Sequence, residues 1–326
     1  MEIIRDLEQL KPLTAPTIAT LGNFDGVHIG HREIFRGVVR KARETGGTAV
    51  VVTFVPHPLK VLMPERAPRL LNTYAEKERL IAASCIDLLV QVPFDETMAT
   101  CPAAEFVKRV LVDGLRIRHL IVGYDYAFGY RRSGDVELLR RLGDEYGFTV
   151  ETVQPVCHEG AAFSSTRVRH LLAAGDVSGV VPLLGRHFTL EGEVVRGASR
   201  GHRLGFPTAN LTTEKEILPR PGVYAVKAKL DDSYFDAVMN IGFNPTFGLE
   251  RISLEVHLLD FARDIYGRQL RVYFVERLRD EMVFSSIEDL VAQIDRDVAS
   301  TRSILQDCDI IEYREYLDCG FQPGDS

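Results

Sequence analysis

The sequence predicts an α/β domain with a doubly wound parallel sheet, followed by an antiparallel β-domain with a C-terminal helix. In the first half of the chain, apolar strand-like runs alternate with helical patterns, which is typical of a parallel sheet with helices on both faces. From Gly185 to about Leu278, short strand-like segments follow one another between Gly, Pro and Asp turns, which favours an antiparallel sandwich or barrel. We therefore expect a boundary at Leu184/Gly185, with domains 1–184 and 185–326.

The first domain is expected to alternate strands and helices from residue 17 onward. The strands are expected at residues 17–21, 48–54, 86–94, 118–124 and 148–155. The first helix starts near Val27 and continues to about Ala42, and further helices are expected at 73–84, 102–114 and 135–147. Thr73 and Glu76 fit a capping box at the start of the second of these helices.

The second domain is expected to consist of short strands that end in turns. The strand patterns lie at residues 187–197, 222–230, 234–242, 251–261 and 267–278. The LDDSYF stretch at 230–235 predicts a hairpin turn. Ser285 and Glu288 fit a capping box, which predicts a helix that runs to about Leu305.

Charge and cysteine content limit the class of protein. A net charge of −7 makes nucleic acid or an anionic membrane an unexpected main partner. The acidic last twenty residues are expected to form a solvated tail. The five cysteines include no CxxC pair, the start MEIIRDLEQL lacks a signal-peptide core, and no apolar run reaches the length of a membrane span. We therefore expect free thiols and a cytoplasmic location, and the sequence leaves self-association open.

The loop GNFDGVHIGH at residues 22–31 is the strongest candidate for chemistry. It follows the buried strand at 17–21 and opens the first helix. If that helix begins near Val27, His28 and His31 lie on one face of its first turn, where backbone N–H groups attract anions. The loop therefore predicts a phosphate site. Purely structural histidines are one alternative, and a zinc site from Asp25, His28, His31 and His57 is another, which no cysteine or carboxylate cluster supports.

This loop resembles the HxGH signature of nucleotidyltransferases, which transfer a nucleoside monophosphate from a nucleoside triphosphate. FSSTRVRHLL at 163–172 resembles the Ser/Thr-rich, Arg-containing motif that closes over the triphosphate in that superfamily; by itself it also reads as a plain helix start. The resemblance implies that His28 and His31 stabilise charge in the transfer and that Arg167 holds the β and γ phosphates. It implies an ATP site made of Gly22, Asn23, Phe24, Asp25, Gly30, Ser164, Ser165, Thr166 and Arg167.

Two further segments resemble the prokaryotic bifunctional riboflavin kinase/FAD synthetase family. They are FVPHP at 54–58 and VGYDYAFGYRRSGD at 122–135. The resemblance implies that His57, Asp125 and Phe128 lie near the adenine or the flavin. From the residues alone, the aromatic side chains of the second segment also fit local packing.

RGHRLGFPTANL at 200–211 resembles the riboflavin kinase signature around PTAN. Thr208 and Asn210 alternate on a strand, so their side chains point the same way. The resemblance implies that these two residues hold Mg2+ and the ATP phosphates, and oxygen ligands suit that hard cation. It implies an ATP site made of Gly197, Gly201, Pro207, Thr208 and Asn210.

Glu255 lies between Leu254 and Val256 on a strand pattern, so its side chain faces away from these apolar neighbours. The pattern alone also fits a solvent-facing carboxylate. The resemblance makes Glu255 the general base for the riboflavin hydroxyl and places Arg279 and Glu281 near the flavin. Asn244 and Val283 depart from the family pattern, where arginine and lysine are common.

The resemblance extends from about Leu21 to Val298 and implies a nucleotidyltransferase-type sheet followed by a riboflavin kinase-type barrel. It implies that the second domain makes FMN and ADP from riboflavin and ATP, and that the first makes FAD and pyrophosphate from FMN and a second ATP, with Mg2+ as cofactor. Two alternatives remain: a nucleotidyltransferase with another acceptor, and a flavin-binding protein without activity. The kinase-like second domain disfavours the first alternative, and the presence of a candidate base disfavours the second.

Overall fold

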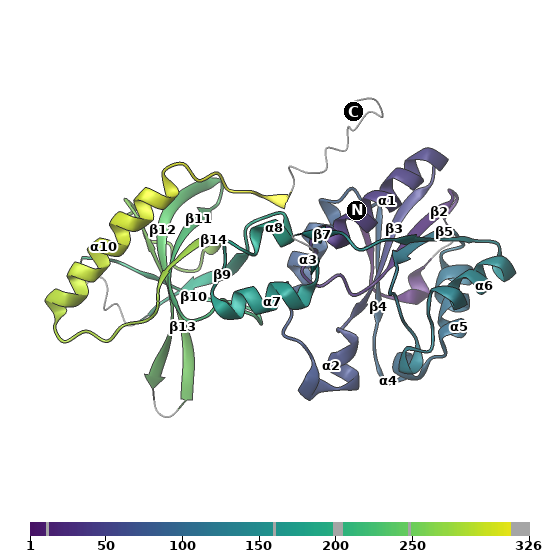
Figure 1. Ribbon diagram of the computed structural model, residues 1–326, viewed down its shortest axis with the longest axis horizontal. Coiled ribbons are helices and arrows are strands. Elements are labelled where there is room, and N and C mark those ends of the chain that lie inside the picture. Colours follow the sequence, from purple (N-terminus) through teal and green to yellow (C-terminus); the bar gives the residue numbers. More distant parts are fainter. Residues whose placement is uncertain (11–12, 159–160, 198–204, 247–248, 314–326) are drawn as a thin grey trace. The chain divides into compact units, whose positions relative to one another are not determined.

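The computed structural model describes residues 1–10, 13–158, 161–197, 205–246 and 249–313 (Figure 1). The chain forms two compact units. The first comprises Met1–Ser164 and a C-terminal piece that begins at Tyr313, and the second comprises Ser165–Glu312. This structural division falls earlier than the boundary expected at Leu184/Gly185. That boundary stays a prediction for the division between the two functional domains.

The first unit is built on a parallel sheet, as predicted (Figure 1). Its strand order is β1-β4-β3-β2-β5-β6, so β2 lies between β3 and β5. The strands are β1 Glu2–Ile4, β2 Thr17–Leu21, β3 Thr48–Val55, β4 Leu88–Pro93, β5 Ile117–Gly123 and β6 Thr149–Val153. The strand order reverses at β2, and ligands of such sheets bind beyond the carboxyl end of a strand at this point. The loop at 22–31 starts at that end.

Helices cover both faces of the sheet, because β2 and β3 are buried on both sides and must pack against apolar helix faces. Phe35 of α1 and Ile81 of α3 belong to one core, whereas Val107 of η3 and Leu139 of α6 belong to the other. The helices are α1 Ile29–Thr45, α2 Pro58–Leu62, α3 Tyr74–Ala82, α4 Glu96–Thr100, α5 Ala103–Phe106, the π-helical η3 Val107–Gly114 and α6 Val136–Tyr146. Thr73 caps α3 as predicted, since its hydroxyl accepts a hydrogen bond from the Glu76 N–H at 3.1 Å.

Local features of this unit differ from the expectation. Strand β1 was not predicted, because three residues gain their strand character only from parallel pairing with Leu88–Val90 of β4. Helix α1 begins at Ile29, two residues later than expected, because Val27 has a φ of 39° and His28 is the N-cap. The helix predicted at 102–114 continues from α5 into a π-helical segment.

The second unit contains a closed antiparallel barrel with the strand order β10-β13-β12-β11-β14-β9 (Figure 1). Its strands are β9 Thr189–Val195, β10 Ala209–Thr212, β11 Gly222–Leu230, β12 Ser233–Thr246, β13 Leu249–Leu258 and β14 Gln269–Arg279. The predicted hairpin is confirmed, since Leu230 pairs with Ser233 across Asp231 and Asp232. In the described part of this unit, the helices are α7 Ser165–Ala174, α8 Val181–Leu184 and α10 Ile287–Leu305. The cap of α10 is Ser286 rather than the expected Ser285, and its hydroxyl accepts from the Asp289 N–H.

Further expectations concern the cysteines, the membrane and the tail. Cys101, Cys157 and Cys308 are free thiols, but Cys85 is disulfide-bonded, so the expectation of free thiols throughout was wrong.

Within the described ranges, we find no helix that combines the length and the apolar character needed to cross a membrane. The expectation of a solvated tail was wrong for Glu312, which forms hydrogen bonds, and for Tyr313, which is buried.

Candidate active sites in the two units

The loop after β2 has a strained backbone. Phe24 and Val27 have φ values of 48° and 39°, and Gly26 has a φ of 83°. Positive φ is uncommon for residues other than glycine and unfavourable for a β-branched residue such as Val27. Residues in this conformation cost about 1–3 kcal/mol each and concentrate at functional sites. The strain therefore supports the interpretation of this loop as an active-site loop.

His28 and His31 are held together at the start of α1. The Nδ1 atom of His28 accepts the backbone N–H of His31 at 3.4 Å, and the two rings stack with centroids 3.6 Å apart. Because Nδ1 is the acceptor, a neutral His28 carries its proton on Nε2 and can donate from there. The structure thus confirms that both imidazoles share one end of the helix, although the helix starts later than expected.

Phe24, Gly30 and Phe163 fix the surroundings of this histidine pair. The rings of Phe24 and His31 are nearly perpendicular, with their centroids 5.3 Å apart. A Cβ atom placed on Gly30 would lie 3.2 Å from the His28 ring and 3.6 Å from Cβ of Phe163. The residue directly before Ser164 therefore lies beside the HxGH loop. Ser165, Thr166 and Arg167 form the first turn of α7 in the second unit, and their role at the triphosphate stays a prediction.

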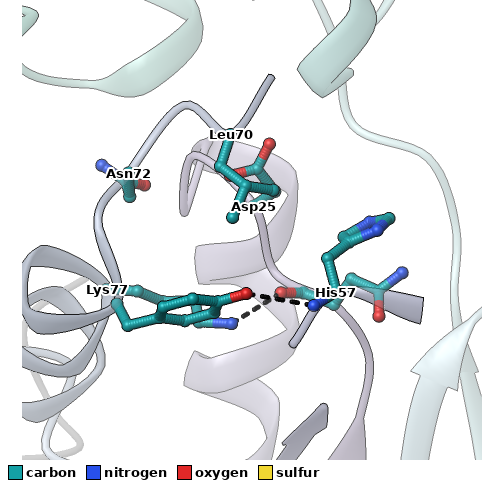
Figure 2. Close-up of a pocket in the computed structure, with 7 residues that line it drawn as sticks. Asp25, His57, Leu70, Asn72 and Lys77 are labelled. Atoms are coloured by element: carbon teal, nitrogen blue, oxygen red, sulfur yellow. Dashed lines mark hydrogen bonds between the residues drawn. The ribbon is translucent and has the colours of Figure 1, made fainter. Parts of the chain in front are cut away.

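A small pocket adjoins the loop in the first unit (Figure 2). Asp25 contributes to its wall and accepts the Leu71 N–H with both carboxylate oxygens, at 3.0 and 3.2 Å. The ammonium group of Lys77, on α3, donates to the Asn23 carbonyl at 3.3 Å and to the Thr53 hydroxyl at 3.2 Å. The lining residues are Asn23, Asp25, His57, Leu70, Asn72, Tyr74 and Lys77.

Lys77 is a buried cation, with 6% of its surface exposed. Burial lowers its pKa to about 8, although the nearby charges of Asp25 and Glu78 act in the opposite direction. Sequence reasoning missed this residue. The available signal was its place in the apolar stripe of α3, three and four residues before the buried Leu80 and Ile81, where a charge is unusual.

The other predicted residues of this unit have different surroundings. His57 lines the pocket and caps α2, since its Nδ1 atom accepts the Leu59 N–H at 3.2 Å. Phe128 is 6% exposed, belongs to the core and stacks on Tyr126, whereas Asp125 is exposed beyond the end of β5. The flavin or adenine contacts of these residues stay predictions. Across the described ranges, no group of three histidine, cysteine or acidic side chains is arranged to hold a metal ion.

In the barrel, Glu255 lies at the centre of a row of polar side chains. It pairs across β13 with Asn210 of β10 on one side and with Asn240 of β12 on the other. Residues directly opposite in an antiparallel pair project from the same face, so the carboxylate lies between two amides. The Ser253 hydroxyl donates to the Glu255 carboxylate at 3.0 Å. The flanking Leu254 and Val256 are buried, which confirms the predicted direction of Glu255.

Two glycines make room for this polar face. A Cβ atom on Gly197 would lie 2.1 Å from Nδ2 of Asn210, so a larger residue there would displace the amide. A Cβ atom on Gly242 would lie 2.2 Å from a carboxylate oxygen of Glu281 and 3.2 Å from Nδ2 of Asn240. The structure therefore brings Glu281 to the face that carries Glu255.

The PTAN segment lies beside β13. Nδ1 of His257 lies 2.8 Å from the Pro207 carbonyl oxygen, which joins the segment to the strand of Glu255. Thr208 directly precedes β10. Gly201 lies outside the described residues.

Arg279 is already engaged by other groups of the barrel unit. Its guanidinium donates to the buried Asp297 carboxylate through Nε and Nη2, at 3.0 and 2.7 Å, and Nη1 donates to the Asp280 carbonyl. The geometry is that of an ion pair that joins β14 to α10. Its predicted contact with flavin stays a prediction. Val283, where the family pattern has lysine, is fully exposed.

Asn240 and Ser253 were not predicted as site residues. Asn240 begins the NIGFNPTF segment and Ser253 precedes Glu255 by two residues, so both stood next to motifs that had been singled out. Ser253 could have been found from the strand period alone, because residues two apart share a face. Asn240 could be identified only from the register of β12 against β13, which cannot be derived from the sequence.

Comparisons with known proteins match both units. The family model described as FAD synthetase matches residues 10–167, and the model described as riboflavin kinase matches residues 184–305. A bifunctional riboflavin kinase/FMN adenylyltransferase of Pseudomonas fluorescens is 42% identical over 305 residues, with 93% of this chain and 98% of that protein covered. The Escherichia coli K12 protein of the same name is 40% identical over 306 residues, with coverages of 93% and 97%.

A crystal structure from Streptococcus pneumoniae, titled as a macrolide-efflux protein, has the same fold. Its TM-score is 0.84 at 32% identity, with 92% of this chain and 98% of that chain covered. Macrolide efflux is named for the Streptococcus pneumoniae protein alone. The architecture of both units is thus shared with a solved structure over nearly the whole length of the chain.

Proposed function

The chain belongs to the bifunctional riboflavin kinase/FMN adenylyltransferase family, and from that premise we propose how its residues divide two reactions between two sites. The enzyme makes FMN and ADP from riboflavin and ATP in its C-terminal domain. It then makes FAD and pyrophosphate from FMN and a second ATP in its N-terminal domain.

In the N-terminal domain, the FMN phosphate attacks the α-phosphorus of ATP, and pyrophosphate leaves. The reaction needs alignment of two anions and stabilisation of the additional negative charge, which preorganised donors supply. His28 fits this role because its Nδ1 atom accepts the His31 N–H, so the neutral ring carries its proton, and hence its donor, on Nε2. His31, stacked against it, completes the pair. This histidine pair on a strained loop is the single observation that carries the proposal.

In the C-terminal domain, Glu255 accepts the proton of the riboflavin 5′-hydroxyl as that oxygen attacks the γ-phosphorus of ATP. Phosphoryl transfer depends mainly on positioning and charge stabilisation, with a carboxylate to receive the proton. The hydrogen bond from Ser253 fixes one oxygen of Glu255, which leaves the other for the hydroxyl. Asn210 and Asn240, on either side, are placed to orient polar groups of the two substrates.

We propose Thr208 and Asn210 as the residues that hold Mg2+. A hydroxyl and an amide oxygen suit a hard cation that takes its remaining ligands from phosphate and water. The missing side chain at Gly197 leaves the space that the Asn210 amide occupies, which supports a fixed position of this amide. The ion, when bound, would neutralise charge on the ATP phosphates.

We also propose a cytoplasmic location, where ATP is abundant, and small-molecule substrates as the main partners. Self-association and the absence of a nucleic-acid partner stay predictions. Of the two alternatives, a nucleotidyltransferase with another acceptor has no use for a second unit that matches riboflavin kinase. A flavin-binding protein without activity would give neither product.

The test is chromatographic separation of flavins after incubation of the protein with ATP, Mg2+ and either riboflavin or FMN. His28→Ala and His31→Ala should each lower FAD formation from FMN about a hundredfold, the scale for loss of one oxyanion-type donor. FMN formation from riboflavin in the same proteins is the internal control and should persist. Retained FAD formation in both variants would overturn the assignment of the histidine pair.

A further inference from the structure

Tyr313 belongs to the hydrophobic core that also contains residues of the loop at 22–31, although in sequence it follows the last helix of the second unit. It is 6% exposed and is part of the core cluster that contains Phe24 and Val27 of the loop and Phe35 of α1. The residue before it, Glu312, is bound within the second unit, where its carboxylate accepts from the Tyr273 hydroxyl at 2.6 Å and from the Lys229 ammonium at 3.1 Å. Tyr313 is thus a core residue of the first unit, although its neighbour in sequence belongs to the second.

Arg32 and Ser84 make polar contacts with Tyr313. The guanidinium carbon of Arg32 lies 4.5 Å from the ring centroid, within the range of a cation–π interaction. The Tyr313 hydroxyl forms a hydrogen bond with the hydroxyl of Ser84, which also donates to the Leu80 carbonyl at 3.0 Å. Both partners are buried, with Arg32 3% and Ser84 1% exposed.

Arg32 directly follows His31 on the first turn of α1. A buried guanidinium must be held by its surroundings, because a charge transferred from water to an apolar interior is unfavourable without compensation. Loss of the Tyr313 ring would remove a contact that stabilises the buried guanidinium. The helical turn that carries Arg32 would then shift to give the charge a more favourable environment. The same turn carries His31, whose backbone N–H is bound by His28.

We propose that Tyr313 is a positioning residue for adenylyl transfer, which acts through Arg32 to keep His28 and His31 in place. The inference rests on the proposed roles of this histidine pair. It means that the geometry of the FAD-forming site depends on a residue beyond α10, outside the residues 10–167 that match FAD synthetase. FMN formation does not depend on this contact.

The experiment uses the full chain and compares Tyr313→Phe with Tyr313→Leu. Phenylalanine keeps the ring under Arg32, whereas leucine fills apolar space without a π face. Tyr313→Leu should lower kcat for FAD formation about tenfold and change KM for ATP less than about twofold, because small displacements of catalytic groups mainly affect the reacting complex. Tyr313→Phe should restore kcat to within about twofold of the parent. FMN formation should be unchanged in both.

Val39→Ala is the matched control for lost packing, because Val39 lies in the same core and on the same helix, two turns beyond His31. It should lower the unfolding temperature but not kcat. If Val39→Ala lowers kcat as much as Tyr313→Leu, or if Tyr313→Leu keeps normal kcat, the positioning role is refuted.

Two further variants keep the test decisive if Tyr313→Leu does not fold. Arg32→Met should reproduce the loss of kcat, and adding Tyr313→Leu to Arg32→Met should cost less than the product of the two single losses, since both substitutions remove the contact between the guanidinium and the ring. Losses that multiply in the double variant would contradict action through Arg32. His28→Ala separates the two hypotheses: normal FAD formation in that variant refutes the proposed histidine site, whereas loss there with normal Tyr313→Leu refutes only the present inference.

Discussion

The loop after β2 and the Glu255 face of the barrel reach their geometry by opposite means. The loop contains Phe24, Gly26 and Val27 with positive φ, and distant groups hold it: the Leu71 N–H binds Asp25, and Lys77 binds the Asn23 carbonyl. On the barrel face, four polar residues lie on paired strands without a positive φ, and the strand register places them. These four residues are Asn210, Asn240, Ser253 and Glu255.

The difference teaches where each site is vulnerable. A strained loop persists only when its surroundings over-determine it, so FAD formation should be sensitive to residues behind the loop that never touch substrate. A face on paired strands is fixed by many backbone hydrogen bonds, so FMN formation should be sensitive mainly to the residues on the face itself. Three substitutions test this contrast.

The largest effect is expected from Gly26→Ala in the loop. The residue has a φ of 83°, and a Cβ atom there would lie 2.7 Å from Cδ1 of Leu71, the residue whose N–H binds Asp25. Gly46→Ala is the control, because Gly46 has a φ of 62° but no atom within 4 Å of the added Cβ. Gly26→Ala should lower FAD formation about a hundredfold, as expected for displaced catalytic groups, and Gly46→Ala should leave it within about twofold. Equal rates in the two variants would contradict the role given to the loop.

An intermediate effect is expected from Lys77, through pH. Burial lowers the pKa of Lys77 to about 8 in the folded chain, against 10.5 as its ordinary value. Between these values the unfolded chain binds more protons, so the free energy of unfolding should rise with pH through this window. From pH 8 to 9.5 the expected gain is about 1.5 kcal/mol.

Urea unfolding of the parent and of Lys77→Met at both pH values measures this contribution as a difference. The gain should disappear in Lys77→Met. Lys41→Met is the matched control on α1, where Lys41 is 40% exposed, and it should keep the gain. The lowered pKa of Lys77 would be refuted if the unfolding free energy of the parent, relative to that of Lys77→Met, falls over this pH range.

The smallest effect is expected from Ser253→Ala on the barrel face. The substitution removes one hydrogen bond of about 1 kcal/mol to the Glu255 carboxylate but leaves the strand register intact. FMN formation should fall about fivefold in kcat, with FAD formation from FMN unchanged. Steady-state rates of both half-reactions measure it, and a loss as large as that of Gly26→Ala would erase the contrast between the sites.

Much of each site was predictable from local sequence. The loop, its two histidines and the direction of Glu255 follow from short-range patterns, since strand burial and the period of two are local properties. The three-residue strand β1, the pairing of Asn240 with Glu255 and the return of Tyr313 to the first unit depend on contacts between distant segments. The start of α1 was misplaced because the left-handed backbone of Val27 arises from the fold of the loop.

The central claim is that one chain carries two separate active sites, one with the histidine pair and one with Glu255. The most direct measurement compares both half-reactions in Glu255→Gln and in His28→Ala. Glu255→Gln should lower FMN formation from riboflavin about a thousandfold, within the range for a lost general base, and keep FAD formation from added FMN. His28→Ala should show the reverse pattern. Parallel loss of both activities in either variant, or normal FMN formation in Glu255→Gln, would contradict the account.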